Sequence, residues 1–253
     1  MALASENLTV PRGRVLFAEF MPGTRAPRDD IRWLGNCSEF TLSRDSSELN
    51  HFGSTGGLRT MDASIPLGGD FGGTLTTDDI NPENVRYWFM GTNQTVSVAA
   101  KTSVVQTIEN VQKGALYQLG RTEQNPLGAK RLSTVAVTAS PGGTAYLEFR
   151  DYEVELPSGL LSIPAGSTIP DDGTITVTYS APAYTYNEVR SGSKVVEGEM
   201  KFISDNPYGP NRELVIPRVS FSPNGDLSFL TDPESPAWQQ LSFSLNVLQK
   251  QLR

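Results

Sequence analysis

The chain has 253 residues, of which 38% are hydrophobic and 19% charged, with 23 glycines and 17 prolines. This composition is typical of a globular protein rich in turns and short strands, and it argues against a helical or disordered chain. The formal net charge of −7 argues against a protein that coats nucleic acid, because binding to phosphate depends on clustered Lys and Arg. We expect one large β domain, or a core domain with a smaller insertion.

The first third of the chain predicts four strands. Gly13–Phe20 and Trp33–Ser43 flank a polar loop, Pro22–Asp30, and we expect a hairpin whose long tip projects from the body. Leu58–Leu67 and Gly73–Thr77 follow, and the glycines between them are expected to bend the chain.

A single helix is predicted after these strands. Asn81 can cap it, Pro82 suits its first position, Glu83 favours its first turn and Gly91 ends it. Three residues at helical spacing are expected to pack on a sheet: Val85, Trp88 and Phe89.

The remainder divides into a middle region and a closing meander. Residues 94–185 are predicted to form a β-rich insertion, because 1–93 and 186–253 then make one continuous core. Gly198–Ser204, Glu213–Phe221 and Gln240–Val247 are expected to be antiparallel strands, the last with strict alternation of apolar and polar residues.

No motif in the sequence predicts a catalytic, cofactor or metal site, and we therefore expect a protein that is not an enzyme. His51 is the only histidine and Cys37 the only cysteine, so an internal disulfide is excluded. Neither residue lies in a nucleophile motif, and the acidic pairs lack the spacing of a calcium loop. Residues 1–10 carry no export signal and no apolar run reaches about 18 residues. We expect a soluble protein without membrane insertion.

Several segments resemble one protein family. Gly198–Pro207 and Leu214–Phe229 contain an Asn-Pro turn and an Asn-Gly turn between extended segments. This order is similar to the closing strands of the major tail tube proteins of long-tailed bacteriophages. Gly13–Phe17, Leu34–Cys37 and Thr76–Val85 resemble the family's first strand, second strand and helix entry.

The resemblance implies a mainly β fold, a tail-tube-type β-sandwich or barrel with one short packed α-helix and the inserted β-rich region. It implies hexameric rings whose strands join edge to edge, stacked into a tube that conducts phage DNA into the host. The implied partners are further copies of the chain, the tail tip or initiator, tape measure and tail terminator proteins, and DNA in transient, non-specific passage. The implied location is the virion, after assembly in the bacterial cytoplasm.

Candidate contact residues follow from the same resemblance. Exposed charges in the first loop are candidates for contact between rings: Arg25, Arg28, Asp29 and Asp30. Polar residues of a closing strand are candidates for the lumen, where a net negative wall would keep DNA from adhering: Glu197, Glu199 and Lys201.

Other functions remain open at this point. The tube protein of a contractile secretion system shares the fold, although such proteins are usually shorter. A capsid decoration protein or a sugar-binding β-adhesin is a further alternative, and an adhesin would present aromatic residues on exposed loops. Trp33, Trp88 and Trp238 are instead predicted in strands or helices. A tail-associated hydrolase would need an acid and base pair, for which Glu153, Glu155 and His51 are the residues to test.

Overall fold

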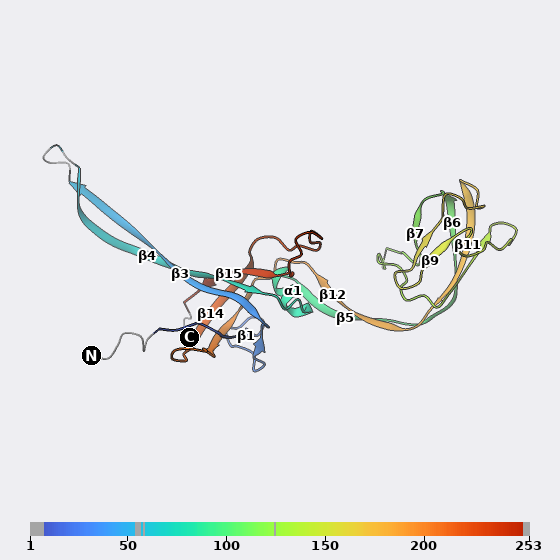
Figure 1. The fold of residues 1–253 in the computed structure, drawn as a ribbon. Coiled ribbons are helices and arrows are strands. Elements are labelled where there is room, and N and C mark those ends of the chain that lie inside the picture. Colours follow the sequence, from blue (N-terminus) through green and yellow to red (C-terminus); the bar gives the residue numbers. More distant parts are fainter. Residues whose placement is uncertain (1–7, 54–56, 58, 124, 250–253) are drawn as a thin grey trace. The chain divides into compact units, whose positions relative to one another are not determined.

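The computed structural model describes residues 8–53, 57, 59–123 and 125–249. The chain divides into two compact units (Figure 1). Unit 1 holds the residues up to Gln94 and those from Asn187 onward, and unit 2 holds Thr95–Tyr186. Unit 2 therefore occupies the place of the predicted insertion. Residues 1–7, which entered the expectation about an export signal, lie outside the described part.

Unit 1 is built on a seven-stranded sheet with the order β2-β1-β13-β14-β15-β4-β3, in which every neighbouring pair is antiparallel. Over the described residues the fold is mainly β with one short helix, as the sequence predicted. The strands are β1 (Gly13–Glu19), β2 (Arg32–Trp33), β3 (Cys37–Gly53), β4 (Thr60–Thr77), β13 (Val196–Ser204), β14 (Glu213–Pro223) and β15 (Leu241–Val247).

One face of this sheet forms the core of unit 1. Leu241, Phe243 and Leu245 are exposed to only 0, 2 and 1%, so the alternation predicted for the last strand is confirmed. The ring of Phe221 lies 4.5 Å from that of Phe17, which joins β14 to β1 across the core. Burial of such side chains stabilises the sheet by about 2 kcal/mol each.

Helix α1 (Pro82–Trp88) begins as predicted. The side-chain oxygen of Asn81 accepts hydrogen bonds from the backbone N–H groups of Glu83 at 3.1 Å and Asn84 at 2.9 Å. These bonds satisfy donors that have no partner within the helix, so the cap fixes where the helix starts.

The predicted packing of α1 on the sheet is confirmed for Val85 and Trp88, but the prediction missed Tyr87 and included Phe89, which is not part of this core. Tyr87 is the buried anchor, 4% exposed, and its ring meets that of Phe17 edge-on at 5.5 Å. Val85 and Trp88 are only partly buried against the same core. The prediction considered only the spacing of Val85, Trp88 and Phe89, whereas the ring of Tyr87 buries more apolar area than a valine side chain does.

A charge network joins α1 to β1. The guanidinium of Arg86 donates to Glu19 at 2.7 Å and to Glu83 at 2.8 Å, and Lys194 donates to Glu19 at 2.9 Å. Burial by itself raises the pKa of Glu19, but the hydrogen bonds from Arg86 and Lys194 outweigh it and leave that pKa below its ordinary value. Glu19 is thus ionised and paired within the fold.

The predicted N-terminal hairpin is confirmed only at its start. β1 pairs with β2 over only two residue pairs, after which the chain turns through Gly35, whose φ is +85°. It then crosses to the opposite edge of the sheet, where β3 pairs with β4.

The bend predicted between Leu67 and Gly73 is wrong, because β4 runs unbroken from Thr60 to Thr77. Hydrogen bonding to β3 keeps these glycines extended.

Gly198 offers a test of packing in the middle of the sheet. A Cβ atom at this position would lie 2.2 Å from the carbonyl oxygen of Ala18 and 2.5 Å from the Phe17 ring. We expect Gly198→Ala to lower the free energy of unfolding by about 2 kcal/mol, the effect of overpacking a core. In Gly68→Ala, where an added Cβ meets nothing within 4 Å, we expect a change within about 0.5 kcal/mol. Urea denaturation compares the variants, and equal stability would contradict the close approach.

Unit 2 has a core of its own, with Leu161, Ile163, Ile169, Ile175 and Val177 fully buried. Its sheets have the orders β6-β11-β8 and β7-β10-β9. A further pair, β5-β12, connects the units in sequence. The strands are β5 (Thr92–Val98), β6 (Lys101–Val111), β7 (Leu116–Gln118), β8 (Thr134–Ala139), β9 (Glu153–Glu155), β10 (Leu160–Ser162), β11 (Gly173–Ala181) and β12 (Tyr184–Arg190).

Candidate assembly surfaces

The face of the unit 1 sheet opposite the core is rich in hydroxyl groups. Thr41, Thr74, Ser244 and Ser222 are successive cross-strand partners, so they form one row across β3, β4, β15 and β14. The hydroxyls of Thr41 and Thr74 are 2.7 Å apart. The neighbouring rows contribute Glu39, Thr76, Ser242, Ser220 and Asn246. We call this surface the hydroxyl face.

The three candidate lumen residues lie on this face. Glu197, Glu199 and Lys201 alternate along β13 with residues on the core side, of which Met200 is 0% exposed. Arg218 donates two hydrogen bonds to Glu197, at 3.0 and 3.1 Å. Lys201 Nζ lies 2.8 Å from a carboxylate oxygen of Glu213. The charges of Glu197 and Lys201 are therefore each paired with an opposite charge on a neighbouring strand.

Both edges of the unit 1 sheet are open. β2 and β3 stand at opposite ends of the strand order, and neither has a second neighbour among the described residues. The single chain thus forms an open sheet rather than a closed barrel. Open edges expose unpaired N–H and C=O groups, which favour pairing with another chain.

The longest free edge belongs to a two-stranded arm, which we define as Ser43–Gly53 of β3 and Thr60–Phe71 of β4. It continues beyond the rest of the sheet (Figure 1). Nearly every described side chain of the arm is exposed. Polar contacts link its strands, including His51 Nδ1 to Asp62 at 2.5 Å and Ser64 to Glu48 at 3.0 Å. An isolated hairpin is only marginally stable in water, so packing of the arm against the surface of another molecule would stabilise it.

Apolar side chains of the arm form exposed cross-strand pairs. Leu49 lies opposite Ile65, with 58 and 59% of their surfaces exposed, and Phe52 lies opposite Met61. The guanidinium of Arg59 lies 4.2 Å from the centre of the Phe52 ring. Exposed apolar groups gathered on one projecting element are typical of an interaction surface. Sequence reasoning missed the arm because both its faces meet solvent, which leaves little alternation.

The candidate ring-contact residues lie in a compact turn between β1 and β2. Arg25, Arg28, Asp29 and Asp30 are all exposed. The turn is closed by backbone hydrogen bonds, including Met21 N to Ala26 O at 2.9 Å. The turn lies near the β2 edge of the sheet, whereas the arm extends from the β3 edge. The two candidate contact regions are therefore at opposite ends of the strand order.

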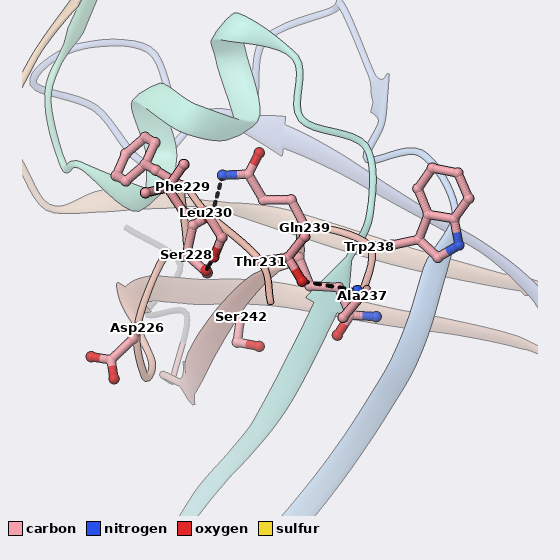
Figure 2. A pocket seen from close by; sticks show the side chains of 10 residues that line it. Asp226, Ser228, Phe229, Leu230, Thr231, Ala237, Trp238, Gln239 and Ser242 are labelled. Atoms are coloured by element: carbon pink, nitrogen blue, oxygen red, sulfur yellow. Dashed lines mark hydrogen bonds between the residues drawn. The ribbon is translucent and has the colours of Figure 1, made fainter. Parts of the chain in front are cut away.

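A second apolar surface of unit 1 is the loop that joins β14 to β15, residues 224–240. It lines a cavity of about 330 Å³ (Figure 2). Phe229, Leu230 and Trp238 are 76, 90 and 91% exposed. Hydrogen bonds within the loop hold it together, such as Gln239 Nε2 to Ser228 O at 2.7 Å. The prediction that Trp238 lies in a strand or helix was wrong.

The residues considered for chemistry do not form one site in either unit. His51 belongs to the arm in unit 1, whereas Glu153 and Glu155 lie on β9 in unit 2. Burial raises the pKa of Cys37 to about 11, so its thiol stays protonated at neutral pH. Among the residues that the structure describes, no group of three or more His, Cys, Asp or Glu side chains could hold a metal ion.

Comparison with known proteins gives one family. A family model described as protein of unknown function UCP028589 matches residues 9–253. No curated protein matches the chain. In the described ranges, no helix is both long enough and apolar enough to cross a membrane.

Proposed function

This chain belongs to that family of unknown function, and we propose that it is the major tail tube protein of a long-tailed bacteriophage. In this proposal the chain is a structural subunit without enzymatic activity. Six copies form a ring, and stacked rings form a tube whose lumen conducts phage DNA into the host.

The arm is the observation that carries the proposal. It presents the pairs Leu49–Ile65 and Phe52–Met61 to solvent on a ribbon with no neighbour in the described chain. A contact between this arm and a different surface of a copy in the next ring is heterologous, and such contacts generate open filaments when the rotation between copies does not close. The loop at 224–240, with its exposed Phe229 and Trp238, is a second apolar surface available for contact between copies.

The open sheet supports the ring. Pairing the free edge of β3 in one copy with the edge at β2 in the next would continue the sheet and remove both exposed edges. Repeating this step around a closed ring gives a barrel of strands from several copies. One face of every sheet then points to the hole and the other, with α1 and the core, points outward.

The hydroxyl face suits the inner wall of such a ring. Tight binding to DNA requires clusters of Lys and Arg that displace counterions from phosphates. On this face Arg218 is paired with Glu197 and Lys201 with Glu213, and much of the remainder is Ser and Thr. DNA would meet a hydrated wall with few sites at which to adhere.

Tail initiator, tape measure and terminator proteins complete the proposed partners. The proposed location is the virion, after assembly in the host cytoplasm.

An adhesin is the second candidate, and one observation favours it. Trp238 and Phe229 lie on an exposed loop beside a cavity, as the aromatic residues of a sugar-binding protein do. An adhesin needs no self-assembly, so the state of the purified chain separates the two functions. The tube of a contractile secretion system would assemble similarly, and a phage origin of the gene would decide against it.

Negative-stain electron microscopy of the full-length protein tests the proposal. We expect rings or hollow filaments with a central channel, either spontaneously or after addition of tail initiator components, because the open edges and the arm are satisfied only by other copies. Analytical ultracentrifugation gives the mass of the ring. A chain that stays monomeric after addition of the initiator would contradict the proposed function.

A further inference from the structure

A second cavity lies in unit 2, on the outer side of the sheet β7-β10-β9. Its volume is about 380 Å³, and it is lined by Leu116, Phe149, Glu153, Val154, Glu155, Leu160 and Ser162. Leu116 and Phe149 are 66 and 82% exposed. Part of the apolar surface of the cleft therefore remains exposed to solvent in the folded unit.

The sheet register builds the floor of this cleft. Leu116, Ser162 and Glu153 are cross-strand partners in one row, and Leu160 pairs with Glu155 in the next. Their neighbour Leu161 is buried in the core of unit 2, and Val154, which also lines the cleft, packs partly against that core. The outer side thus carries an apolar strip next to two carboxylates.

A rigid turn presents the aromatic ring. Phe149 has a φ of +65°, a conformation unfavourable for a bulky L residue. Its N–H donates to Tyr152 O at 2.8 Å. The adjacent Asp151 is fully buried and accepts hydrogen bonds from Leu147 N at 2.9 Å and Thr168 Oγ1 at 2.8 Å. The buried carboxylate fixes the turn, so the exposure of the ring is built into the fold.

The charge of the cleft selects a cation. Neither Glu153 nor Glu155 has an ion-pair partner in the described part of the chain. The face of an aromatic ring also attracts cations. The two carboxylates are two residues apart on one extended strand, hence about 7 Å apart, which is the spacing of alternate side chains on another extended strand.

We propose that this cleft binds an extended basic segment of a partner protein, with Lys or Arg at two alternate positions. Their aliphatic stems pack on Leu116, Phe149 and Leu160, and their charged ends pair with Glu153 and Glu155. This inference concerns unit 2 alone and does not depend on tube formation by unit 1.

Fluorescence anisotropy with labelled peptides tests the site on the full-length chain. A Thr-Lys-Thr-Lys-Thr peptide is expected to bind more tightly than Thr-Lys-Lys-Thr-Thr, and Thr-Glu-Thr-Glu-Thr is expected not to bind. Glu153→Gln should weaken binding of the first peptide by about tenfold. Glu109→Gln, at an exposed carboxylate on β6, should leave binding unchanged.

Phe149→Gly separates binding from folding. Glycine adopts a positive φ without strain, so this variant should lose about tenfold in affinity while its thermal unfolding midpoint is not lowered. Equal binding of both lysine peptides, or equal effects of Glu153→Gln and Glu109→Gln, would overturn the proposal by showing unspecific attraction. Binding of glucosamine oligomers without binding of the peptides would overturn it in favour of a glycan site.

Discussion

Replacing residues 45–70 by an Asn-Gly turn is expected to abolish filament formation while the subunit stays folded. Arg44 and Phe71 are cross-strand partners, so a two-residue turn between them closes a regular hairpin. None of the removed residues that the structure describes belongs to the core of unit 1. The free energy of unfolding should therefore change little, whereas every contact made by the arm is lost.

Electron microscopy and sedimentation measure assembly, and circular dichroism measures folding. A subtler variant, Leu49→Thr with Ile65→Thr, keeps the β propensity but removes one exposed apolar pair. Its matched control, Asn50→Thr with Ser64→Thr, changes the adjacent pair on the other side of the arm. We expect the first variant to weaken assembly and the second to leave it intact. Normal filaments from the deletion variant would show that the arm is not an assembly element.

Arg86→Met is expected to lower the free energy of unfolding by about 3 kcal/mol at neutral pH, because loss of one partner strands a buried charge. Glu19, with 8% of its side chain exposed, would keep only Lys194 as a partner. Urea denaturation measures the change. Arg190→Met is the matched control: Arg190 is 65% exposed and pairs with Glu188 at 3.1 Å, so a loss under about 1 kcal/mol is expected.

The same network predicts how stability depends on pH. The pKa values of Glu19 and Glu83 lie below their ordinary value of 4.5 in the folded chain. Burial alone would raise both, but it is outweighed by hydrogen bonds from Arg86 and Lys194 to Glu19 and from Asn93 and Arg86 to Glu83. Their contribution is therefore complete above pH 4.5 and is lost as the pH falls through the folded-state values. Arg86→Met should flatten this acid dependence. An unchanged slope would contradict the ionised network.

Local patterns in the sequence predicted the local structure well. The alternation in β15 and the cap at Asn81 both describe neighbours in sequence, and both are confirmed. The sheet order is different, because it depends on pairing between residues far apart in the chain. β1 and β3 are close in sequence but stand on opposite halves of the sheet, which no local pattern indicates.

The candidate surfaces were predictable only in part. Glu197, Glu199 and Lys201 share one face because strand periodicity fixes it, but their pairing with Arg218 and Glu213 depends on the tertiary register. The sequence does not predict the arm, because a two-stranded ribbon exposed on both faces shows no regular alternation of apolar and polar residues. The glycines of β4 also favour a bend over a continuous strand.

The pairing of β5 with β12 has a practical consequence. The chain leaves unit 1 and returns to it through two neighbouring strands, which are also linked by Gln94 Nε2 to Glu188 Oε2 at 2.8 Å. The entry and exit points of residues 95–186 are thus adjacent, as at the boundaries of an exchangeable cassette. We therefore expect that a reporter or a foreign epitope domain with closely spaced termini can replace residues 95–186 without redesign of unit 1.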